Sequence, residues 1–183
     1  MKSLRLAFSF SLLFAVSIAS ARTSVKCNVN ALPKSVSETL SSRYAEWKIK
    51  TVDDLESYDK ELWLKNNPLD CPGIASGHFV DSGDQSFAVL LIPKEPDANG
   101  YKVIVFSKPD SESPYVPKVV AEAKSQNSAS MVIYRVPPGT YSDAEQTRRV
   151  QIRLDSFQLE ILEASATLYF WQGGRFQHLL TSE

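Results

Sequence analysis

Histidine, cysteine and glycine are scarce in this chain, whose 183 residues contain two, two and seven of them. His78 and His178 are the only histidines, which restricts metal ligation and acid–base catalysis. No C-x-x-C, H-E-x-x-H, glycine-rich phosphate loop or G-x-S-x-G motif occurs. The common signatures of zinc sites, nucleotide-binding loops and serine hydrolases are therefore missing, and we predict no metal, no cofactor and no catalytic residue.

The chain also lacks a basic block or stripe, although it contains 20 lysines and arginines. Proteins that bind nucleic acid or an anionic membrane surface usually carry such a patch. Beyond the N-terminal segment, no stretch is apolar enough to cross a hydrocarbon core of about 30 Å. We therefore expect neither a nucleic-acid partner nor a stable membrane anchor.

The N-terminus has the features of a cleavable secretory signal. Lys2 and Arg5 precede an apolar run over 6–18, and Ala-Ser-Ala at 19–21 offers the small residues that a signal peptidase accepts. An N-terminal membrane anchor is the alternative, but a helix of this apolar run, at about 1.5 Å per residue, is shorter than the bilayer core. We predict a signal peptide over 1–21 and one mature domain over 22–183.

Removing that signal takes away Lys2 and Arg5 and changes the formal net charge from −1 to −3. Both cysteines, Cys27 and Cys71, remain in the mature part. An even number of cysteines in an exported chain predicts one disulfide, worth up to about 4 kcal/mol by chain entropy. Two buried or reactive thiols are the alternative. The expected location is the periplasm or the exterior of the cell.

The spacing of apolar residues predicts an α+β domain. We expect one helix near 35–44, a strand at 47–50, and a second helix that follows Asp53-Asp54 and stops at Asn66-Asn67-Pro68. From residue 74 the pattern changes to that of strands: the run at 87–92 predicts a central strand buried on both faces, and Asn99-Gly100 predicts a hairpin with 101–106.

Further strands are expected at 119–123, 131–136, 150–154, 157–161, 167–171 and 175–180. Asp155-Ser156 forms a two-residue connection between two of them, 107–118 is a proline-rich loop or edge segment, and 140–148 is a polar excursion. The expected architecture is an antiparallel β-meander of about eight strands, with the two N-terminal helices packed on one face.

Residues 77–91 resemble a strand–loop–strand unit of the FG-GAP or VCBS type, in which an acidic loop is followed by a strand like Ala88-Val89-Leu90-Leu91. In that family the loop oxygens bind calcium. Here His, Val, Ser and Ser stand at 78, 80, 82 and 86, so Asp81 and Asp84 supply too few of the six to eight oxygens that calcium requires. The resemblance implies the hairpin without the metal.

A catalytic alternative rests on Asp70-Cys71-Pro72-Gly73, which resembles the nucleophile motif of the NlpC/P60 cell-wall peptidases. In that motif, the N-terminus of a helix lowers the pKa of the cysteine and favours attack. This resemblance implies a cell-wall hydrolase that uses Cys71. The strand expected from residue 74 does not match that motif, because the family has a helix there.

The overall plan resembles small, uncharacterised exported bacterial proteins. The shared features are Cys71-Pro72-Gly73, the strand over 86–91 and the closing segment over 169–176. Tyr169, Trp171 and Arg175 adjoin an expected Gly-Gly turn, and aromatic residues and arginine are typical anchors of protein interfaces. The same rings could instead close the end of the sheet.

Our leading hypothesis is a non-enzymatic exported domain that binds another protein, for example as an inhibitor or immunity factor. Either 107–118, with Asp110, Glu112 and Tyr115, or 140–148 could fill a cleft in that partner. In 107–118, three prolines limit the entropy lost on binding. A carbohydrate-binding module that uses exposed, coplanar rings of Tyr169 and Trp171 is a further alternative.

Overall fold

The protein is represented by a computed structural model that describes Cys27 and residues 32–183. The expected signal peptide over 1–21 lies outside these described residues. The helical elements are α1 (Lys34–Arg43), the short 3-10 helix η2 (Val52–Asp54) and α2 (Ser57–Asn66). The strands are β1 (Trp47–Ile49), β2 (Ile74–Gly77), β3 (Ser86–Pro93), β4 (Tyr101–Ser107), β5 (Val116–Ala123), β6 (Met131–Val136), β7 (Gly139–Ser142), β8 (Arg149–Ile152), β9 (Ser156–Ile161), β10 (Ser165–Gln172) and β11 (Arg175–Ser182).

Sheet A contains β1 to β5, and all its strand pairs are antiparallel. One side of β3 pairs with β4, whereas the other side is shared by β2 and β1, which pair with successive halves of β3. Alternate residues of β3 point to opposite faces, and both faces are covered by apolar side chains. The predicted central strand and its hairpin with 101–106 are thus confirmed.

Sheet B has the order β11-β10-β9-β6, and β7 pairs with β8 in a separate two-stranded ribbon. The chain is therefore α+β as expected, but the single meander of about eight strands is wrong. The chain passes from sheet A to sheet B between β5 and β6, and the expected hairpin of β8 with β9 is interrupted at Asp155-Ser156. The Asp155 carboxylate accepts the backbone N–H of His78 at 2.9 Å, and the Ser156 hydroxyl donates to the carbonyl of Val136. These long-range bonds place β9 beside β6, so that it does not continue a hairpin with β8.

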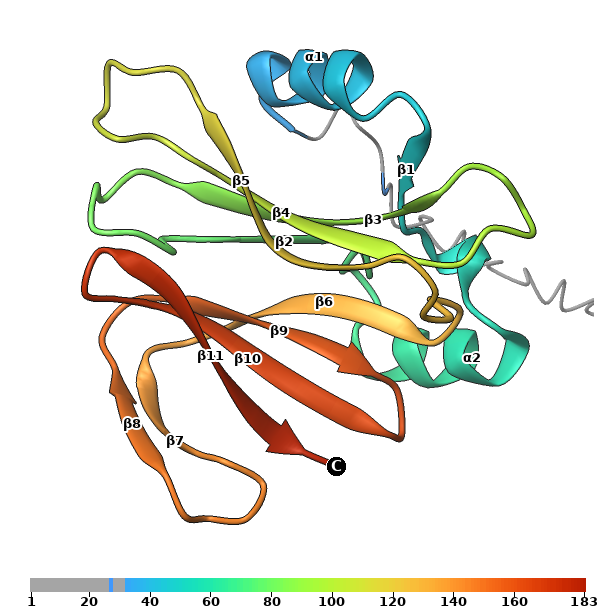
Figure 1. The fold of residues 1–183 in the computed structure, drawn as a ribbon. Coiled ribbons are helices and arrows are strands. Elements are labelled where there is room, and N and C mark those ends of the chain that lie inside the picture. Colours follow the sequence, from blue (N-terminus) through green and yellow to red (C-terminus); the bar gives the residue numbers. More distant parts are fainter. Residues whose placement is uncertain (1–26, 28–31) are drawn as a thin grey trace, which may run out of the picture.

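The two sheets pack face to face, and the main core lies between them (Figure 1). On the sheet A side, α1 covers the outer face with Val36 and Leu40. On the sheet B side, α2 packs Trp63 against Val132, and the β7–β8 ribbon covers a second area of the same outer face. Both predicted helices exist, but the expectation that they share one face is wrong, because each buries its apolar side against a different sheet.

Sheet A ends at β5, which has several features of a protected edge strand. Val116 and Val119 are exposed, and Pro117 removes one backbone donor. The register with β4 shifts between Val103 and Ile104, which marks a bulge. Such features discourage another strand from pairing there.

The predicted disulfide is present. Cys27 and Cys71 are bonded, and their Cα atoms lie 5.1 Å apart. Cys71 packs against the apolar cluster beneath α1, so the bond connects the N-terminal arm to the start of sheet A. Within the described ranges, no helix has the length and apolar character needed to cross a membrane.

Candidate functional site

Three connections that are distant in sequence meet at one end of the two sheets, on the left in Figure 1. They are the β2–β3 connection, the β4–β5 connection and the tight turn between β10 and β11; we call them together the loop end. The Tyr115 hydroxyl donates to the carbonyl of Gln85 at 3.1 Å, and Trp171 Nε1 donates to Asp81 Oδ2 at 2.6 Å. Lys118 Nζ lies 5.6 Å from the Trp171 ring centroid. The three connections are thus fixed to one another.

The turn between β10 and β11 places Trp171 at this end. Gly173 and Gly174 both have positive φ angles, of 62° and 75°, which suit a type I′ turn and strongly favour glycine. The tight turn keeps the strands in register, so that Trp171 lies opposite Phe176 with the two rings edge to face at 5.1 Å. The indole is therefore held by Phe176, Lys118 and Asp81.

Beside Trp171 lies a hollow of about 670 Å³, which we call the arginine hollow. Its lining consists of residues 148–151 and 153–154 on and around β8, residues 171–173 at the end of β10, and Asp81. Three arginines, Arg148, Arg149 and Arg153, contribute to this lining, and all three are exposed.

None of these three guanidinium groups forms an ion pair or hydrogen bond within the described part of the chain. This contrasts with the nearby Arg135, which lies 3.7 Å from Asp155. Arginine presents several N–H donors in a planar fork that matches a carboxylate, phosphate or sulfate. The hollow is therefore chemically suited to an anion, although the formal net charge of the full sequence is −1.

Sequence analysis did not identify these arginines as binding residues: it named 140–148 as a polar excursion that could fill a partner's cleft, without singling out Arg148, Arg149 or Arg153. The available signal was the cluster Arg148-Arg149-Val150-Gln151-Ile152-Arg153, which holds three arginines in six residues. In β8 the apolar Val150 and Ile152 are buried, so Arg149 projects from the opposite face, and Arg153 is the first residue after the strand.

The structure places the predicted binding residues of the last hairpin, Tyr169, Trp171 and Arg175, in different surroundings. Trp171 lines the hollow, and Arg175 is exposed beside the Gly-Gly turn. Tyr169 instead packs on the inter-sheet core, where its ring stacks on Phe157 at 5.3 Å with 8° between the planes. Burial raises the pKa of the Tyr169 hydroxyl to about 12. Tyr169 and Trp171 therefore have different surroundings.

The predicted binding residues of the 107–118 segment also differ from one another in their contacts. The Asp110 carboxylate accepts hydrogen bonds within its own loop, chiefly from Ser113, and these lower its pKa. Glu112 is exposed. Tyr115 is half-buried and packs edge to face on Phe87 at 5.6 Å. Asp110 thus shapes the loop and Tyr115 attaches it to sheet A, which leaves Glu112 as the side chain directed to solvent.

Cys71 does not have a free thiol in the structure. The Cys71 sulfur is bonded to Cys27 and is therefore not a thiolate. Among the residues that the structure describes, no group of three or more histidine, cysteine, aspartate or glutamate side chains could hold a metal ion. Asp81, in the loop that resembles a calcium unit, accepts the hydrogen bond from Trp171.

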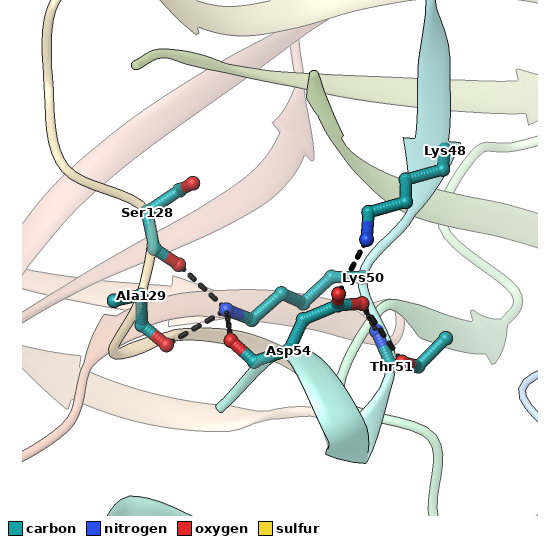
Figure 2. A network of polar contacts seen from close by, with 6 residues as sticks. All are labelled: Lys48, Lys50, Thr51, Asp54, Ser128 and Ala129. Carbon is teal, nitrogen blue, oxygen red and sulfur yellow. Dashed lines mark hydrogen bonds and ion pairs between the residues drawn. The ribbon is translucent and has the colours of Figure 1, made fainter. Parts of the chain in front are cut away.

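Lys50 is the other charged group with unusual surroundings (Figure 2). Its side chain is fully buried, and its ammonium donates to the carbonyls of Asp54, Ser128 and Ala129 at 2.6, 2.8 and 2.7 Å. Burial lowers the pKa of this ammonium to about 8, against the opposing effect of the Asp54 carboxylate. All three N–H donors are used, so the group connects η2 to the β5–β6 connection and has no donor left for a ligand.

The Asp54 carboxylate completes this network. It accepts hydrogen bonds from the backbone N–H and hydroxyl of Thr51 at 2.8 and 2.7 Å, and from Lys48 at 2.6 Å. Burial by itself would raise the pKa of Asp54, but the hydrogen bonds from Lys48 and Thr51 outweigh it and lower the pKa below its ordinary value. We interpret the network as structural and the loop end as the candidate functional site.

Comparisons of the chain with models of protein families, with curated proteins and with solved structures found no match.

Proposed function

We propose that this protein is an exported, non-enzymatic domain that binds another protein through its loop end, in the manner of an inhibitor or immunity factor. The observation that carries the proposal is the group of three connections fixed around Trp171, beside a hollow with three unpaired guanidinium groups. The proposal therefore rests on a surface whose guanidinium groups have no ion-pair or hydrogen-bond partner among the described residues.

Rigidity at the loop end favours recognition. The hydrogen bonds Tyr115–Gln85 and Trp171–Asp81 order the connections before a partner arrives. Binding then loses less conformational entropy than it would with flexible loops. Tryptophan, tyrosine and arginine are also the side chains that most often contribute strongly to protein interfaces.

The disulfide supports the export part of the proposal. Disulfides form and persist in oxidising compartments such as the periplasm and the extracellular space, and they are rare in the cytosol. The bond between Cys27 and Cys71 is consistent with such a location, and the N-terminal signal pattern gives the route.

Site-specific photocrosslinking in the native export compartment tests this proposal. A benzophenone amino acid would replace Gln172, which is exposed and lines the hollow, or Lys65, which is exposed on α2 far from the loop end. We expect one protein to be crosslinked from position 172 and not from position 65. Trp171→Ala should reduce this crosslink strongly. Equal crosslinking from both positions, or no dependence on Trp171, would contradict the proposal.

A further inference from the structure

Strand β8 has an unused edge next to the arginine hollow. Within the part of the chain that the structure describes, its one partner strand is β7, which pairs with it from Gly139↔Ile152 to Ser142↔Arg149. Six of the residues that line the hollow come from the stretch 148–154, so the hollow extends along β8. Among the described residues, no other backbone group bonds to β8 from its second side.

The hydrogen-bonding pattern of the β7–β8 ribbon shows which backbone N–H and carbonyl groups of β8 face away from β7. The N–H of Asp143 donates to the carbonyl of Arg148 at 3.0 Å, whereas the N–H of Arg148 donates to the Asp143 carboxylate; the one backbone bond places these opposed residues at a hydrogen-bonding position of the ribbon. Such pairs recur at every second residue, which directs the backbone groups of Val150 and Ile152 towards β7. The N–H and carbonyl groups of Arg149 and Gln151 therefore face the open edge.

The charges along this edge have the periodicity of a strand. Arg149 and Gln151 project from the same side of β8, about 7 Å apart, and Arg153, directly after the strand ends at Ile152, occupies the next position of this alternation. An extended segment beside β8 would carry its own alternate side chains at the same spacing, about 5 Å from those of β8. Acidic residues at every second position would thus meet the two guanidinium groups.

We propose that the arginine hollow binds an extended acidic segment of the partner protein, which adds to β8 as a further strand. This inference rests on the proposed function and names the chemistry of the partner. Backbone hydrogen bonds to Arg149 and Gln151 supply the pairing, and carboxylates on alternate residues bind Arg149 and Arg153. Trp171 and Asp81 form another part of the wall of the hollow.

The open backbone groups favour a polypeptide over other polyanions. Phosphate and sulfate groups could bind the arginines, but polyphosphate and sulfated glycans have no regular row of N–H donors for the carbonyls of Arg149 and Gln151. An extended peptide offers both donors and acceptors at the required repeat. Charge complementarity and the strand edge therefore specify the same occupant.

Binding of short fluorescent peptides to the exported chain tests the inference. The probe is Thr-Glu-Val-Glu-Val-Glu-Thr, and the comparison peptide has glutamine in place of each glutamate. Fluorescence anisotropy at 50 mM salt should show about tenfold tighter binding of the glutamate peptide, decreasing at 300 mM salt because exposed ion pairs are screened. Arg149→Gln combined with Arg153→Gln should remove most of this preference.

N-methylated peptides test the strand pairing separately from the charge. Only one of the two alternate sets of peptide amides can face β8. Methylation of that set should weaken binding about tenfold, whereas methylation of the other set should leave the affinity within about twofold. Equal effects of the two sets would overturn the strand-addition mechanism.

Arg43→Gln is the matched control, because Arg43 is an exposed arginine at the end of α1, on the other side of the molecule. It should leave peptide affinity unchanged. Polyphosphate that binds more tightly than the glutamate peptide, or peptide-independent self-association through β8, would overturn the inference. If crosslinking at position 172 still captures a partner while the peptides do not bind, the inference fails and the proposed function stands.

Discussion

Trp171 and Asp81 are 90 positions apart, yet the indole Nε1 donates to the Asp81 carboxylate at 2.6 Å. The bond joins the last hairpin of sheet B to the β2–β3 connection of sheet A. It therefore connects the two sheets at the end where the candidate site lies. Because both residues line the arginine hollow, the bond also fixes part of its wall.

A double-mutant cycle with Trp171→Phe and Asp81→Asn should measure this connection. Phenylalanine removes the N–H donor, and asparagine removes the negative charge of the acceptor. We expect the two effects on the free energy of unfolding to be coupled by about 0.5–1 kcal/mol, because the bond is charge-assisted but exposed. Urea denaturation provides the measurement, and strictly additive effects would show that the bond contributes nothing.

Replacing the buried lysine should destabilise the fold more than replacing its exposed neighbour. Lys50→Met retains a long side chain but leaves the carbonyls of Asp54, Ser128 and Ala129 without their donor. We expect a loss of about 3 kcal/mol and a fall in Tm of about 6–12 °C. Lys48→Met, which loses only the partly exposed pair with Asp54, is the control and should cost under about 1 kcal/mol.

Acid should remove the stabilisation that Asp54 provides. Hydrogen bonds from Lys48 and Thr51 lower its pKa in the folded protein, so the stabilisation is complete above the unfolded pKa of about 4. It is lost as the pH falls through the lower, folded pKa. Asp54→Asn should therefore be less stable than the wild type at pH 7, and the difference should shrink below pH 4. A constant difference from pH 7 to pH 2 would contradict this assignment.

Reduction of the disulfide should lower stability substantially. The bond closes a loop with a sequence separation of 44, for which chain entropy gives about 4 kcal/mol. We expect Tm to fall by about 8–16 °C in reductant. The doubly substituted variant Cys27→Ser, Cys71→Ser should show the lower Tm with no further response to reductant. Alkylation of the denatured, unreduced protein should detect no free thiol; labelling of Cys71 would reopen the hydrolase hypothesis.

Local patterns in the sequence were sufficient to predict most elements of the fold. The apolar run of β3, the Asn99-Gly100 signal and the Gly173-Gly174 turn each specify structure within a few residues. The assignment of strands to sheets was not predictable in this way. It depends on bonds such as Asp155 to His78, which join positions 77 residues apart and leave no local pattern.

The candidate site was predictable only in part. Trp171 and Arg175 were identified from their place beside a tight turn, and Tyr115 from its proline-rich loop. The hollow itself requires β8 to lie beside the end of β10, which no alternation of residues specifies. Sequence alternation also did not predict that Tyr169 and Trp171, only two positions apart, would have different environments.

The open edge of β8 has a consequence for the free protein in solution. Two identical molecules that met antiparallel at this edge, with Gln151 at the twofold axis, would set Arg149 of each beside Arg153 of the other. Like charges directly opposite each other on neighbouring strands are unfavourable. The charge pattern that we expect to attract an acidic strand should therefore also prevent homodimerisation through β8.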